Sequence, residues 1–91
     1  MGIKRYHLVV SGRVQGVGYR YSTRNFALKL GLVGWVKNRD DGKVEIVAEG
    51  DKIHLEELAE WTKHGPRFSQ VDAVDIEQQP ASGKFSDFNI H

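Results

Sequence analysis

Short apolar segments of two different periods, separated by turns that contain glycine, constrain the fold of this chain more than any other feature. Residues 5–11 and 43–48 alternate in polarity from one residue to the next, which is the period of a half-buried strand. Within 55–62 the apolar residues recur at i, i+3 and i+4, as on a helix that faces a core. None of these segments buries its apolar side alone, so strands and helices must pack against each other in layers.

Turn residues divide the chain into seven expected elements. Gly31 and the pair Gly65-Pro66 are expected to end the two helices. Asp41-Gly42 between two alternating runs predicts a β-hairpin, and residues 49–51 are expected to form a loop. The expected strands are 5–11, 33–38, 43–48, 71–78 and a short one at 85–90, and the expected helices are 19–30 and one that includes 55–62.

The order of these elements is βαββαβ followed by the short fifth strand. This order predicts an α+β fold, a ferredoxin-like (split βαβ) sandwich with both helices packed on one face of a mixed, mostly antiparallel sheet. In that arrangement the first two strands run parallel, joined by the first helix, and the third strand lies between them. The length of 91 residues fits one domain, so we expect a single domain over 1–91.

Charge and cysteine content exclude several classes of function. Thirteen Lys and Arg residues against 12 Asp and Glu residues give a net charge of +1, too small for bulk electrostatic binding to nucleic acid or membranes. The chain contains no cysteine, which excludes disulfide scaffolds and cysteine nucleophiles and fits a reducing compartment. The apolar run at 8–10 is far too short for a signal-peptide core or a membrane span. With no pattern typical of a dimer seam, we expect a cytoplasmic monomer without nucleic-acid or membrane partners.

The sequence indicates neither a metal site nor a serine nucleophile. The histidines are His7, His54, His64 and His91, and their spacing matches no compact set of metal ligands. A Gly-x-Ser-x-Gly elbow, which would present a nucleophilic serine, does not occur. We therefore expect no metal and no cofactor.

The most informative segment is the glycine-containing stretch GRVQGVGYR at 12–20, between a predicted strand and a predicted helix. Val17 and Tyr21 stand where the Walker A and dinucleotide motifs require glycine, so neither motif is present. Glycines still allow consecutive main-chain N–H groups to line one concavity, here at a helix N-terminus that favours an anion. Arg20 can direct its guanidinium at the same anion. The segment predicts a cradle for one phosphate group; the alternative is a tight glycine turn beside a solvated arginine.

Asn38 is predicted to return to the level of this loop. The helix after Arg20 carries the chain back by roughly 16 Å at 1.5 Å per residue. The strand that ends at Asn38 then advances about 20 Å at 3.3 Å per residue. Because the first two strands are parallel, the loop and Asn38 lie at carboxyl ends of strands, where ligands commonly bind. A carboxamide beside an anion site can hold a water molecule, whereas the alternative for Asn38 is a simple turn-forming residue.

These motifs resemble those of the acylphosphatase family. The matching segments are GRVQGVGYR at 12–20, GWVKN at 34–38 and DGKVE at 41–45. Weaker agreement continues through 30–32, Glu49-Gly50 and Gly65-Pro66, so the similarity extends over nearly the whole chain.

The resemblance implies a ferredoxin-like sandwich that hydrolyses acyl phosphates, the mixed carboxylic–phosphoric anhydrides, without a metal. By position it assigns Arg20 to phosphate binding and catalysis, and Asn38 to orienting the attacking water. Inorganic phosphate is then both a product and a competitive inhibitor. Substrate binding is assigned to the main-chain amides of Gln15, Gly16, Val17, Gly18, Tyr19 and Arg20.

The chain departs from the family pattern at two places. Tyr19 stands where the family usually has Phe, and its hydroxyl needs either solvent or a hydrogen-bond partner. The sequence ends at Ile90-His91, where many relatives have a basic–aromatic pair, so a role of that terminus does not follow from the resemblance.

Three other functions fit parts of the pattern. A non-catalytic phosphate- or anion-binding regulatory module on the same fold would use the same cradle, and the sequence leaves it open. An RNA-recognition domain needs exposed aromatic residues on its central strands, and 43–48 contains none. An acylphosphatase-like unit of a larger hydrogenase-maturation protein would act on carbamoyl phosphate. Within these 91 residues no appended domain is indicated, so we expect a stand-alone enzyme.

Overall fold

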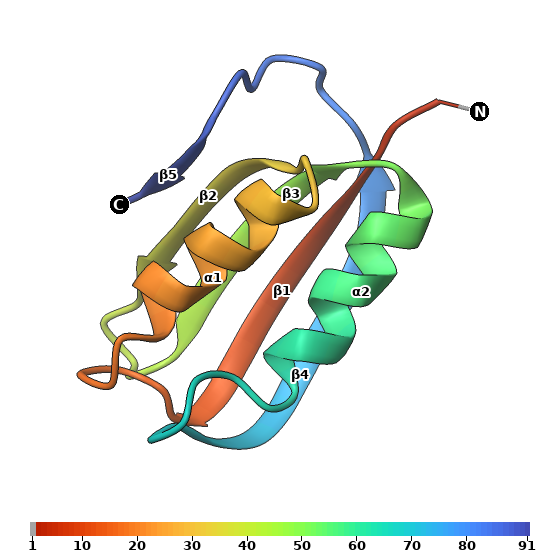
Figure 1. Cartoon of the computed structure of the whole chain (residues 1–91). Helices are drawn as coiled ribbons and strands as arrows, with labels where there is room; N and C mark the ends of the chain where they lie inside the picture. Colours follow the sequence, from red (N-terminus) through yellow and green to blue (C-terminus); the bar gives the residue numbers. More distant parts are fainter. Residues whose placement is uncertain (1) are drawn as a thin grey trace.

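The structure, a computed structural model, describes residues 2–91 and contains the seven expected elements. Figure 1 shows their arrangement along the chain. The strands are β1 (Lys4–Arg13), β2 (Val33–Asn38), β3 (Val44–Gly50), β4 (Gln70–Pro80) and β5 (Phe88–Ile90), and the helices are α1 (Tyr19–Lys29) and α2 (Lys52–Thr62). Neither helix of the described chain has the length and apolar character needed to cross a membrane.

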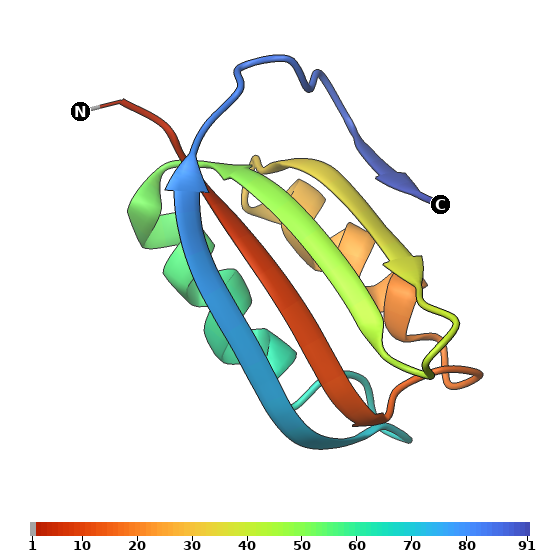
Figure 2. The same ribbon diagram turned by 180° about the vertical axis from the view of Figure 1, so that it is seen from behind.

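The five strands form one sheet in the order β4-β1-β3-β2-β5. β3 pairs antiparallel with both β1 and β2, so β1 and β2 run parallel to each other on either side of it. β5 pairs parallel with β2 at the edge. Both helices cover one face of the sheet, and the view from behind shows the other face (Figures 1 and 2). The predicted ferredoxin-like arrangement is confirmed.

The core lies between the sheet and the two helices. Tyr6, Leu8 and Val10 of β1 are buried, as their alternation predicts. From the helices, Ala27 of α1 and Leu58 of α2 are also buried against this face. The core is therefore a single apolar layer, and the functional groups must lie at its edge.

β1 extends further than predicted. It continues through Gly12 and Arg13, so the loop expected at 12–18 begins at Val14. The register against β4 shifts between Ser11 and Gly12, where Gly12 has φ 126°. A Cβ atom at Gly12 would collide with the main-chain oxygen of Gln70, so only glycine allows this irregularity.

Glu49 was expected in a loop, but it lies in β3 and its side chain is fully buried. Its carboxylate accepts hydrogen bonds from Arg5 Nε at 2.8 Å and from the main-chain N–H groups of Ser82 and Gly83 at 2.8 and 3.0 Å. It thereby holds the connection between β4 and β5 against the sheet. The predicted strand at 85–90 is correspondingly shorter, because only 88–90 pair with β2.

The charge of Glu49 is stabilised by these donors. Burial opposes ionisation, but the hydrogen bonds from Ser82, Arg5 and Gly83 outweigh it and hold the pKa of Glu49 below its usual value of 4.5. A carboxyl group whose pKa is lower in the folded state contributes stability above its unfolded pKa. That contribution is lost as the pH falls through the folded pKa.

We predict that Glu49→Gln lowers the free energy of unfolding by about 3 kcal/mol at neutral pH, because it breaks a buried charge pair. The difference between wild type and variant should shrink as the pH falls below 4.5, because the unfolded wild type then takes up a proton at Glu49 more readily than the folded state does. Urea unfolding at neutral pH and at about pH 3 measures both values. Glu57→Gln, on the exposed side of α2, is the matched control. A difference that stays constant with pH would contradict the role of the charge.

Candidate functional site

Two connections meet at one end of the sheet. The loop between β1 and α1 lies beside the turn between β2 and β3, which can be followed in both views (Figures 1 and 2). A cavity of about 160 Å³ opens at this meeting point. Its lining residues are Val14, Gly16, Gly18, Tyr19, Arg20, Tyr21, Asn38 and Ile90. The two side chains to which the sequence assigned chemistry, those of Arg20 and Asn38, are therefore brought to the same cavity.

The glycine loop leaves main-chain donors at the start of α1. Gly16 and Gly18 have φ values of 75° and 78°, a left-handed conformation that residues with side chains rarely adopt. The first helical hydrogen bond runs from Ser22 N to Gly18 O, so the N–H groups of residues 19–21 precede it. No side chain of residues 2–91 caps this helix start, and its first turn carries no acidic residue. The N-terminus of α1 is thus suited to bind an anion.

Tyr19 fixes the loop to the core. Its side chain is buried, its ring lies 5.5 Å from that of Trp61, and its hydroxyl donates a 2.7 Å hydrogen bond to Thr62 O. The hydroxyl by which the chain departs from the family pattern therefore has a partner at the end of α2. Burial raises the pKa of Tyr19, so the phenol stays protonated and acts as a donor.

Arg20 is held by the edge of the sheet. Its Nη1 donates a 3.0 Å hydrogen bond to the main-chain oxygen of His91. The His91 N–H donates to Val36 O at 2.8 Å, and the His91 ring stacks on Trp35 with centroids 5.7 Å apart. Within residues 2–91, Arg20 forms no ion pair with an acidic side chain. Its guanidinium is therefore positioned by a main-chain oxygen and not by an Asp or Glu.

Asn38 is the last residue of β2, and within the described chain its side-chain oxygen lacks the hydrogen-bond partner that buried polar atoms usually have. Its Oδ1 is buried and has no hydrogen-bond partner among the residues that the structure describes. A buried acceptor without a donor costs about 1–3 kcal/mol, and most native proteins avoid it. Asn38 also lines the cavity beside Arg20, so its carboxamide lies next to the space that a bound molecule would occupy.

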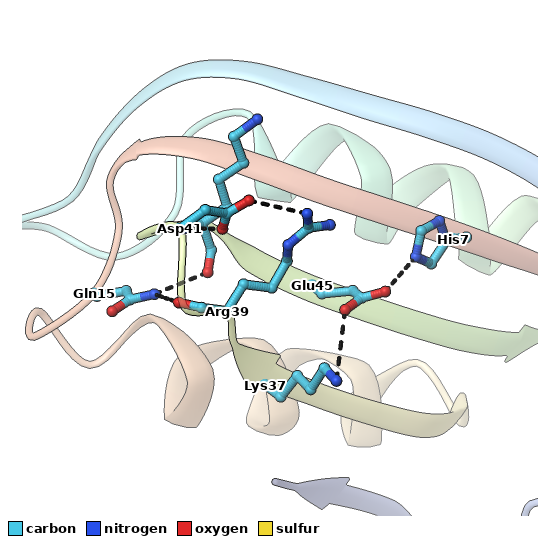
Figure 3. A network of polar contacts seen from close by, with 7 residues as sticks. His7, Gln15, Lys37, Arg39, Asp41 and Glu45 are labelled. Carbon is cyan, nitrogen blue, oxygen red and sulfur yellow. Dashed lines mark hydrogen bonds and ion pairs between the residues drawn. The ribbon is translucent and has the colours of Figure 1, made fainter.

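The side chain of Gln15 has a role that the sequence did not reveal. Its Nε2 donates to Arg39 O at 2.8 Å and to Lys43 O at 2.9 Å, so it joins the glycine loop to the turn that follows Asn38 (Figure 3). Gln15 and Val17 are not among the lining residues of this cavity, and substrate binding by their main-chain amides stays a prediction. Val17 instead packs against the core.

Charged side chains stiffen the same turn. Arg39 and Asp41 form an ion pair of 2.9 Å, and the main-chain N–H of Lys43 donates to Asp41 Oδ1 at 3.1 Å. The hydrogen bond from Lys43 and the neighbouring Arg39 lower the pKa of Asp41, so its carboxylate stays ionised. Further along the hairpin, Glu45 lies 2.7 Å from His7 Nε2 and 3.8 Å from Lys37 Nζ (Figure 3).

Potential metal ligands do not gather in the described part of the chain. Among residues 2–91, no three His, Asp or Glu side chains lie close enough together to hold a metal ion. His7, His54 and His64 instead lie beside single carboxylates.

Two exposed lining residues, Tyr21 and Ile90, were also missed by the sequence analysis. Tyr21 could have been suspected because it directly follows Arg20. Ile90 could not, because its position depends on the parallel pairing of β5 with β2, which places it opposite Val36.

The fold and the cavity together define a class of small α+β protein in which the end of one strand and the start of a helix share a cavity. The acylphosphatase family model matches residues 6–90. An acylphosphatase from Marinobacter nauticus is 53% identical over 88 residues, which cover 97% of this chain and 96% of that protein. The chain belongs to the acylphosphatase family.

Solved structures agree with this assignment. The crystal structure of an acylphosphatase from Bacillus subtilis matches with a TM-score of 0.93 and 43% identity, covering 97% of this chain and 98% of that one. Full-length HypF, in a phosphate- and nucleotide-bound form, contains a region that matches with a TM-score of 0.90 and 30% identity. That match covers 98% of this chain but 12% of HypF. The chain is an enzyme that hydrolyses acyl phosphates.

We predict that Gln15→Leu lowers kcat for acyl phosphates about tenfold, equivalent to about 1.4 kcal/mol. The substitution removes two hydrogen bonds that position the turn after Asn38, and each contributes about 1 kcal/mol. KM should change little, because the main-chain amide of residue 15 is retained. Steady-state kinetics of the variant and of Gln78→Leu, an exposed control on β4, measure the difference. Equal kcat values in the two variants would show that the Gln15 side chain does not position the site.

Proposed function

We propose that residues 1–91 act as a single catalytic domain that hydrolyses acyl phosphates by metal-free, in-line attack of water. Arg20 and the main-chain amides of 15–20 bind the phosphoryl group, and Asn38 orients the attacking water. The observation that carries this proposal is that Asn38 lines the same cavity as Arg20, while its buried Oδ1 has no protein partner among residues 2–91.

The step itself needs few groups. The water oxygen forms a bond to phosphorus while the bond between phosphorus and the acyl oxygen breaks, and the electron pair leaves with the carboxylate. A carboxylic acid has a pKa near 4, so this leaving group departs without a general acid. Phosphoryl transfer passes through a loose transition state in which the protein mainly positions the reactants and stabilises charge. A cradle of amides with one guanidinium performs both tasks.

The proton of the attacking water goes to a phosphoryl oxygen in this scheme. Among the described residues, neither a carboxylate nor a histidine side chain lines the cavity. The Tyr19 phenol donates to Thr62 O and its pKa is raised by burial, so it does not serve as a base. The substrate is then its own proton acceptor, and the products are a carboxylate and inorganic phosphate.

Cytoplasmic location and a monomeric state complete the proposal. The absence of cysteine from the sequence fits a reducing compartment. Arg20 and Asn38, the two side chains assigned to the reaction, reach the cavity from this chain alone, which fits a monomer.

Hydrolysis of benzoyl phosphate in excess EDTA tests the reaction and its metal independence together. We expect undiminished turnover after chelation, because the scheme uses only protein groups and water. Inorganic phosphate should raise the apparent KM without changing kcat, as expected for a product that occupies the cradle. Loss of activity on chelation, restored by a divalent cation, would overturn the metal-free mechanism.

Substitutions at the two side chains should have different kinetic effects. Asn38→Ala should lower kcat about 100-fold or more, the usual cost of removing one group that acts in the transition state, with little change in KM. Arg20→Gln should raise KM and lower kcat together, because the guanidinium binds the phosphoryl group in both the ground state and the transition state. Wild-type kcat in Asn38→Ala would remove Asn38 from the mechanism.

A further inference from the structure

The cavity has a volume of about 160 Å³, and both Arg20 and Asn38 are in its lining. A phosphoryl group bound by Arg20, with the attacking water beside Asn38, occupies the part of the cavity next to these two residues. The acyl group extends from there past the other lining residues, and the side chains exposed at the rim determine which acyl groups are favoured.

Two side chains of the lining are both large and exposed. Tyr21, in the first turn of α1, is 62% exposed, and Ile90, at the end of β5, is 38% exposed. Ile90 pairs with Val36, two residues before Asn38, so Ile90 lies on the same face of the sheet as Asn38. Val14 and Tyr19 are buried, and Arg20 and Asn38 are assigned to the phosphoryl group and the water.

The rim is held in place by hydrogen bonds on both sides of Ile90. Arg24 Nε of α1 donates to Phe88 O at 3.3 Å, and the His91 N–H donates to Val36 O at 2.8 Å. β5 is thus tied to α1 and to β2, and Ile90 is presented by a fixed backbone. A preorganised apolar contact loses little freedom when a ligand binds.

In-line geometry identifies the side on which the acyl group leaves. If water is held by Asn38, the leaving group lies on the opposite side of phosphorus. The surface beyond Asn38 belongs to the charged hairpin turn, where Lys37, Arg39 and Asp41 line a second hollow. The acyl group therefore leaves on the side away from these charges. The large exposed side chains that remain in the cavity lining are those of Tyr21 and Ile90.

We propose that Tyr21 and Ile90 form an acyl-binding rim that selects acyl phosphates with a flat, apolar acyl group over those with a small one. The proposal rests on the proposed function and adds its substrate class. An aromatic acyl group packs against the Tyr21 ring and the Ile90 side chain, whereas an acetyl group is too short to cover them. No acidic or lysine side chain from the described residues lines the cavity, and the Tyr21 ring and the Ile90 side chain offer an acyl group apolar contact.

The test compares kcat/KM for benzoyl phosphate and acetyl phosphate in wild type, Tyr21→Ala, Ile90→Ala and the double variant. The change in the ratio of the two values between proteins cancels the intrinsic reactivity of the substrates. We expect Tyr21→Ala to lower the benzoyl-to-acetyl ratio about tenfold, the usual range for a lost apolar contact in a pocket. The change should appear in KM for benzoyl phosphate. The inhibition constant of inorganic phosphate, which does not reach the rim, should stay the same.

Two controls accompany these variants. Tyr21→Phe should keep the wild-type ratio, because the ring and not the hydroxyl makes the contact. Ile53→Ala removes an equally apolar side chain that is 68% exposed at the start of α2. Ile53 lies near Gly2 and Lys4, at the first residues of β1, and so at the opposite end of β1 from the cavity. The benzoyl-to-acetyl ratio of this variant should match that of the wild type.

The outcomes separate this proposal from the proposed function. An unchanged ratio in the double variant overturns the rim while hydrolysis of both substrates by the wild type still supports the enzyme. The rim proposal also fails if the benzoyl-to-acetyl ratio changes in Lys37→Ala but not in Tyr21→Ala. That result would place the acyl group over the hairpin between β2 and β3. If the wild type hydrolyses neither substrate, the proposed function fails and the rim with it.

Discussion

The parallel course of β1 and β2 on either side of β3 brings the loop after one strand against the residue that ends the other. A parallel pair separated by one antiparallel strand has both carboxyl ends at the same edge of the sheet. The glycine loop follows β1, and Asn38 ends β2, so both reach one cavity without an insertion or a second domain. Gln15 then fixes the distance between them through its two hydrogen bonds to the turn after Asn38. Sheet topology thus sets the approximate geometry, and one side chain refines it.

The proposed site obtains its electrostatics mainly from main-chain dipoles. The chain has a net charge of +1, and Arg20 is the only charged residue that lines the cavity among those described. Main-chain N–H groups at a helix start carry fixed partial charges that need no reorganisation when an anion binds. They require a backbone that stays in place, which explains the buried ring of Tyr19 and its hydrogen bond to Thr62. An acyl phosphate suits such a site, because its carboxylate leaving group needs no acid from the protein.

Much of the fold and the outline of the site could be predicted from the sequence, because they depend on local patterns. Alternation at 5–11 and the Asp41-Gly42 turn act over a few residues, and so does the glycine loop. Apart from Tyr21, which directly follows Arg20, the features that were missed depend on long-range contacts. Glu49 resembles a turn residue until Ser82 and Gly83, more than thirty positions away in the sequence, supply its donors. The exposure of Ile90 at the cavity likewise depends on the register of β5 with β2, which three tail residues do not encode by themselves.

The same long-range contacts connect stability to the site. Glu49 holds Ser82 and Gly83, and the chain from there leads directly into β5. β5 pairs with β2, and His91, which follows it, provides the main-chain oxygen that accepts the hydrogen bond from Arg20. The buried carboxylate therefore lies at one end of a continuous series of contacts, and the guanidinium assigned to the phosphoryl group lies at the other. A protein of this size has a small core, and here the contact that holds the connection between β4 and β5 also supports the strand after which Arg20 finds its hydrogen-bond acceptor.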